Sequence, residues 1–151
     1  MKILAVIFSV LAISAHAEVN AFYQLEVCDA GQGPQTLTFW MGQNTITAND
    51  QQGQKFLEAN NVNQGLQTSW KFIALGRQDR YEIEASFKQS VLSRNERRFG
   101  HLVLSPLGLP YYEKQTTISF EQQGQMRLEE SVRSTFMGPV EKTDCTYFGQ
   151  Q

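Results

Sequence analysis

Alternating apolar and polar residues recur along most of this chain. Apolar side chains occupy every second position in Tyr81-Ile83-Ala85-Phe87, and charged or polar residues stand between them. Successive side chains of a strand point to opposite faces, so this period of two predicts strands with one buried and one wet side. The pattern predicts further strands at Ala21 to Val27, Leu37 to Met41, Phe99 to Leu104, Thr116 to Phe120, Met126 to Phe136 and about Thr143 to Phe148, with Glu130 interrupting one apolar face.

Two segments depart from simple alternation. Leu66 to Leu75 is apolar on both faces, which predicts a well-covered strand with Trp70 and Phe72 in the core. Asp50 to Val62 starts with a possible N-cap and carries Phe56, Leu57 and Ala59 at roughly helical spacing. Gly53 and the Asn60-Asn61 pair weaken that pattern, so we expect a short helix or an ordered loop here.

Short turn sequences separate the predicted strands. They are Gly31-Gln32-Gly33-Pro34, Gly76-Arg77-Gln78-Asp79 and Gln122-Gln123-Gly124-Gln125. Short connections force antiparallel neighbours, so the chain is expected to form a meander. The predicted fold is all-β: an antiparallel up-and-down barrel of about eight strands, or a β-sandwich, with at most one short helix. In general shape such a barrel resembles the lipocalins, but no Gly-x-Trp sequence occurs near the first strand, and no family is assigned.

The N-terminus has the three parts of an export signal. Lys2 is followed by an apolar run from Ile3 to Ile13 and by Ala15-His16-Ala17, a small-x-small cleavage sequence. This predicts a signal peptide at 1–17 and a single exported β domain at 18–151, located in the periplasm or secreted. The apolar run is too short for a membrane span and no later stretch approaches 18 apolar residues, so no integral membrane protein is expected. Cys28 lies too far from the cleavage sequence to be an acylated lipoprotein cysteine.

Cys28 and Cys145 are the only cysteines and lie near the two ends of the exported domain. Export to an oxidising compartment favours a disulfide between them. Such a bond would join the first strand to the last, as closure of an up-and-down barrel permits, because bridged Cα atoms lie within about 7 Å.

The charge distribution argues against nucleic acid as a partner. The whole chain has 13 basic and 15 acidic residues, but between Lys71 and Arg98 basic residues outnumber acidic ones by seven to four. This stretch could face an anionic partner, although the solvated faces of two strands and a loop are the simpler interpretation.

The sequence lacks the residues of most catalytic and metal sites. The exported domain contains one histidine, His101, which is expected to be an ordinary strand residue, and it has no Gly-x-Ser-x-Gly elbow. No metal site and no cofactor are therefore expected. Paired carboxylates could still act as acid and base, with Glu82 and Glu84 or Glu129 and Glu130 as candidates. A small Glu-dependent hydrolase remains the weakest of three alternatives.

The apolar, proline-bracketed segment from Ser105 to Tyr112 is the candidate recognition loop. Rigid prolines and neighbouring tyrosines are typical of binding surfaces, although such a loop could equally fold over a barrel mouth. The candidate binding residues are Leu107, Leu109, Tyr111 and Tyr112 of this loop, Arg97 and Arg98 of the preceding cluster, and Trp40. The favoured function is a non-catalytic exported binding protein that holds a small apolar ligand or an envelope protein. A structural or assembly accessory factor of a bacterial surface machine is the alternative.

Overall fold

The computed structural model describes residues 19–73, 77–100 and 106–150, which form one antiparallel sheet. The strands are β1 (Val19–Ala30), β2 (Thr36–Met41), β3 (Thr45–Asn49), β4 (Lys55–Asn60), β5 (Gln67–Ile73), β6 (Arg77–Lys88), β7 (Val91–Phe99), β8 (Tyr112–Phe120), β9 (Gln125–Arg133) and β10 (Val140–Gly149). The described helical structure is limited to two 3-10 turns, η1 (Pro106–Gly108) and η2 (Gln122–Gly124). Neither is a helix long and apolar enough to cross a membrane.

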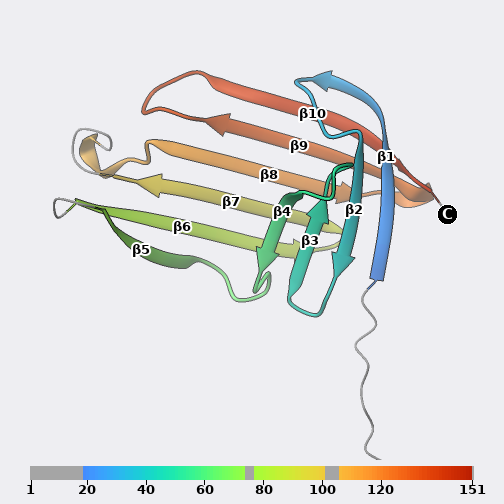
Figure 1. The fold of residues 1–151 in the computed structure, drawn as a ribbon, viewed down its shortest axis with the longest axis horizontal. Coiled ribbons are helices and arrows are strands. Elements are labelled where there is room, and N and C mark those ends of the chain that lie inside the picture. The colour runs from blue at the N-terminus through green and yellow to red at the C-terminus, as the bar shows by residue number, and fades with distance from the viewer. Residues whose placement is uncertain (1–18, 74–76, 101–105, 151) are drawn as a thin grey trace, which may run out of the picture.

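The sheet order is β4-β3-β2-β1-β10-β9-β8-β7-β6-β5. Every pair joins strands that follow each other in the chain except β1 and β10, the first and the last. In Figure 1 the short strands β2, β3 and β4 cross over the long strands, and the sheet curls into a half-barrel. The predicted barrel-like all-β meander is therefore confirmed, with ten strands instead of about eight.

The core lies on the inner face of this curl. Cross-strand partners Leu92, Ile118, Leu128 and Cys145 form one buried row across β7 to β10. The short strands cover this row with Leu37, Phe39, Ile46, Ala48, Leu57 and Ala59. The rings of Tyr23, Phe39, Phe87 and Phe120 lie next to it, with centroids 5.3 to 6.2 Å apart. Side chains thus fill the covered half of the inner face.

Most of the predicted strand faces are confirmed. Ala85 is buried and Phe87 packs against the core, as do Met126 and Phe120. Tyr81 and Ile83 are only half-buried, because β6 extends beyond the area that β2 to β4 cover.

A β-bulge corrects the predicted face of β1. Leu25 pairs with Tyr147, whereas Val27 pairs with Thr146, so Glu26 is an extra residue on β1. The bulge shifts the alternation by one position. Val27 is consequently 49% exposed, and Cys28 takes the inward position opposite Cys145.

The segment from Asp50 to Val62 contains a turn and then strand β4 (Lys55–Asn60) in place of a helix. The Asp50 carboxylate accepts hydrogen bonds from the backbone N–H groups of Gln52 and Gln54, both at 2.9 Å, and this turn leads into β4. Leu57 and Ala59 then point into the core with a period of two. Tertiary burial thus outweighs the weak helical spacing.

The prediction for one other strand also needs correction. β5 is an edge strand, and Trp70 is 59% exposed instead of buried. The strand predicted at Phe99 to Leu104 falls mostly on residues that the structure does not describe, and β7 ends at Phe99. Residues 101–105, including His101, lie outside the described residues, as does the predicted signal peptide.

The predicted disulfide between Cys28 and Cys145 is confirmed. It joins paired residues of β1 and β10, and Cys145 is 1% exposed. A buried disulfide indicates an oxidising, extracytoplasmic environment.

Candidate functional site

The strand geometry distributes the predicted binding residues over both faces of the sheet. Arg97 and Arg98 are adjacent in β7 and point to opposite sides. Arg97 faces outward and lies beside Leu107 and Leu109. Arg98 faces inward, and its guanidinium lies 4.6 Å from the ring centroid of Tyr112.

Tyr111 and Trp40 complete the predicted set. The backbone N–H of Tyr111 donates to the carbonyl of Arg98 at 3.0 Å, which holds the start of β8 against the end of β7. Trp40 is on β2, which pairs with β1 and β3, so it lies apart from the other candidates. The structure therefore brings Arg97 together with Leu107 and Leu109 on one face and Arg98 together with Tyr112 on the other, and it leaves Trp40 out.

The predicted binding residues Arg97, Leu107 and Leu109 line a cavity that we call the rim groove, with a volume of about 570 Å³. It lies where η1 and the β9–β10 connection meet at one end of the sheet (Figure 1). Its lining residues are Arg97, Phe99, Leu107, Gly108, Leu109, Pro110, Glu113, Arg133, Phe136 and Met137. The sequence pattern indicated the loop but not the contribution of Arg133, Phe136 and Met137.

Two of the lining residues combine exposure with an unusual backbone. Leu107 is 90% exposed with φ 61°, and Met137 is 80% exposed with φ 55°. The left-handed region disfavours residues that carry a Cβ, and glycine adopts it more readily. Neither burial nor backbone geometry therefore accounts for the apolar side chains at these two loop tips.

The arginines of the rim groove retain unused hydrogen-bond donors. Arg133 Nη2 lies 3.2 Å from Glu113 Oε2, while Arg97 Nε lies 3.6 Å from Glu82 Oε2. The Nε atoms of Arg97 and Arg133 are buried and have no hydrogen-bond partner among the described residues. Each guanidinium has five N–H donors, so both can donate hydrogen bonds to an additional carboxylate at their exposed ends.

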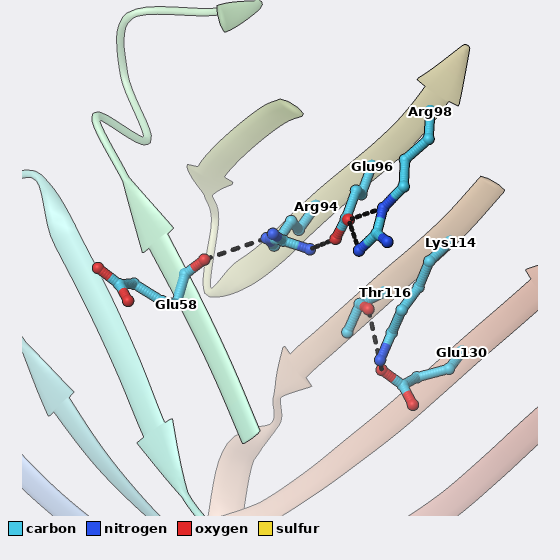
Figure 2. A network of polar contacts seen from close by, with 7 residues as sticks. All are labelled: Glu58, Arg94, Glu96, Arg98, Lys114, Thr116 and Glu130. Atoms are coloured by element: carbon cyan, nitrogen blue, oxygen red, sulfur yellow. Dashed lines mark hydrogen bonds and ion pairs between the residues drawn. The ribbon is translucent and has the colours of Figure 1, made fainter. Parts of the chain in front are cut away.

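A second cavity, which we call the inner polar pocket, lies on the uncovered half of the inner face and has a volume of about 340 Å³. The free edge of β4 forms one wall, and β7 and β8 form the floor (Figure 2). Its lining residues are Lys55, Phe56, Leu57, Glu58, Arg94, Glu96, Tyr112, Lys114 and Thr116.

Ion pairs and hydrogen bonds connect the polar side chains of this pocket. Glu96 receives hydrogen bonds from Arg94 at 3.0 Å and from Arg98 at 2.8 Å. Lys114 Nζ lies 2.8 Å from Glu130 Oε1, which also accepts from Thr116 Oγ1 at 3.0 Å. Burial raises the pKa of Glu96, but the hydrogen bonds from Arg98 and Arg94 outweigh it and hold the pKa below its usual value. Glu96 is therefore an anion at neutral pH.

The candidate acid–base pairs do not converge in either cavity. Glu129 and Glu130 are adjacent in β9 and point to opposite faces. Glu82 pairs with Arg80 and Arg97 on the outer face, and Glu84 is exposed. In the described ranges, no three His, Cys, Asp or Glu side chains are grouped to hold a metal ion.

Comparison with protein-family models, curated proteins and solved structures gives no significant match.

Proposed function

We propose that this protein is an exported, non-catalytic binding protein that recognises a protein partner through the rim groove. The observation that carries the proposal is the pair of exposed apolar side chains, Leu107 and Met137, on strained loop tips. Contiguous exposed apolar surface is a marker of interaction sites in soluble proteins. The predicted export signal and the disulfide support a periplasmic or secreted location.

The chemistry of the groove favours a partner segment that carries apolar side chains next to a carboxylate. The apolar floor includes Phe99 and Phe136, while Arg97 and Arg133 supply donors on either side of Glu113. A small apolar ligand inside the half-barrel is disfavoured, because aromatic and aliphatic side chains occupy the covered inner face.

A photo-crosslinking experiment tests the proposal. A benzophenone amino acid at position 107 in the native host should crosslink to one defined protein, through an acidic and apolar segment identified by mass spectrometry. The same amino acid at Thr117, on the outer face away from the groove, is the matched control. The purified partner should bind Leu107→Gly/Met137→Gly at least ten-fold more weakly than wild type.

The double variant separates binding from folding. Glycine relieves the left-handed strain at both positions, by roughly 1 kcal/mol each, so stability should be retained or increased. Equal affinity of wild type and variant would contradict the proposal, as would identical crosslinks from positions 107 and 117. Cosedimentation with phosphatidylglycerol vesicles that depends on Leu107 would assign the groove to a membrane surface instead.

A further inference from the structure

The inner face changes from apolar to charged at the same level in β7 and β9, the two strands that flank β8. Along β7, Leu92 is followed on this face by Arg94 and Glu96. Along β9, Leu128 is followed by Glu130. The side chains of Arg94, Glu96 and Glu130 are only 15, 14 and 12% exposed.

Stability alone does not explain these charges. When an ion pair is buried, the attraction between its charges does little more than offset the cost of removing both charges from water. Proteins in which such a pair is replaced by well-packed apolar residues are often equally stable or more stable. An extension of the apolar core along the same strands would have served the fold equally well. We call the charged inward-facing residues Arg94, Glu96 and Glu130 the polar row. This row is therefore expected to have a function of its own.

One contact of the row is structural. Arg94 Nε donates to the backbone carbonyl of Glu58 at 3.0 Å and holds the free edge of β4 against the sheet (Figure 2). Lys114, Glu130 and Tyr112 take no part in that contact. Lys114 and Tyr112 line the pocket beside this contact, and Glu130 pairs with Lys114.

Every charge in the pocket has an opposite charge beside it. Lys55 pairs with Glu58, Lys114 with Glu130, and Glu96 with both Arg94 and Arg98. An ionic ligand would thus meet a like charge beside every opposite one, and an apolar ligand would leave the ion pairs without solvent. A hydroxyl group both donates and accepts, so it can bond to the remaining N–H groups and carboxylate lone pairs together.

Two rings add apolar surface to this polar lining. Lys114 Nζ lies 5.6 Å from the centroid of Phe56, and Arg98 approaches Tyr112 from one side. A few fixed polar groups between aromatic side chains, in a pocket of about 300–1,000 Å³, are typical of small-molecule sites. We infer that the inner polar pocket binds a neutral saccharide, with its hydroxyl groups on the ion pairs and its carbon face against Tyr112.

Calorimetric titration of the purified protein tests this inference. The neutral probes are triacetylchitotriose, maltotriose and cellotriose, and the charged probes are glucose 6-phosphate and trigalacturonate. We expect at least one neutral trisaccharide to bind more tightly than both charged probes. Tyr112→Ala should weaken that binding at least ten-fold.

Two further variants separate a binding role from a structural one. Lys114→Met/Glu130→Leu replaces the ion pair by apolar side chains and should remain folded while losing saccharide binding at least ten-fold. Leu107→Gly, in the rim groove, should bind saccharide like wild type. No binding of the neutral probes at millimolar concentration, tighter binding of a charged probe, or full affinity in the folded double variant would each overturn the inference.

Discussion

Tyr147 is the largest fully buried side chain in the described part of the chain, and its phenol is a titratable group. Its hydroxyl donates to the carbonyl of Pro34 at 3.0 Å. Burial, and secondarily the charge of Glu130, raises the pKa of Tyr147 above the usual 10.0. The folded state therefore binds this proton more tightly than the unfolded chain does.

The sign of the resulting pH dependence follows from linkage. A raised folded-state pKa gives a stabilisation that is complete below the unfolded pKa of 10.0 and is lost as the pH rises toward the folded value. We predict that the free energy of unfolding of wild type falls steeply above pH 10. Tyr147→Phe should cost about 1 kcal/mol at pH 8, from the lost hydrogen bond, and should flatten the fall above pH 10.

Urea denaturation at pH 8, 10 and 11 measures this difference. Tyr112→Phe, which removes a half-buried phenol at the inner polar pocket, is the matched control and should follow the wild-type profile. Parallel profiles of wild type and Tyr147→Phe above pH 10 would show that Tyr147 is not the responsible group.

At the residue scale the candidate sites were only partly predictable. Arg97 and Arg98 belong to one cluster in the sequence, yet strand geometry places them on opposite faces of the sheet, with Arg97 in the rim groove and Arg98 beside Tyr112. Leu107 and Leu109 are contiguous with Pro110 and could be found as one loop. Met137 and Arg133 reach the same groove through the pairing of β8 with β9, which a single sequence does not specify.

At the scale of elements, the alternation of apolar and polar residues predicted correctly which face of most strands is buried. It failed where a β-bulge shifted the alternation or where the inward positions were charged. Glu26 adds one residue to β1 and inverts the face of Val27, although nothing in the local pattern marks a bulge. In β7 the inward positions beyond Leu92 are charged, so the strand has no continuous apolar face to recognise.

The two halves of β9 provide a direct test of how the inner face is divided. Leu128 is fully buried under the short strands, whereas Val132 faces the same way from the uncovered half and is partly exposed. Leu128→Ala should lower the free energy of unfolding by about 2–5 kcal/mol, because it removes buried methyl groups and leaves a cavity. Val132→Ala should cost about 1 kcal/mol or less.

Denaturant titrations of both variants with unchanged m-values would establish the comparison. Equal losses would mean that the covered area extends over the whole inner face. That outcome would also remove the inner polar pocket as an accessible site.

At the scale of the molecule, the fold consists of two meanders, β1 to β4 and β5 to β10, joined through the β1–β10 pair. This is the one strand pair in the described sheet whose members are distant in the chain. The other pairs can close locally, so bringing β1 and β10 together carries most of the loop-closure entropy. The disulfide lies in this pair and links residues 117 positions apart.

We therefore predict that the disulfide contributes as much to stability as a large side chain of the buried core. On the chain-entropy model a loop of this length corresponds to about 5 kcal/mol. The double variant Cys28→Ala/Cys145→Ala should lose roughly 3–5 kcal/mol in urea denaturation at neutral pH, and reduced wild type should unfold at a similar urea concentration. Reduction should leave Cys28→Ala/Cys145→Ala unaffected, which controls for side effects of the reductant. If oxidised wild type and the double variant differed by less than 1 kcal/mol, strand pairing alone would hold the two meanders together, and the bond between β1 and β10 would have no major part in stabilising the half-barrel.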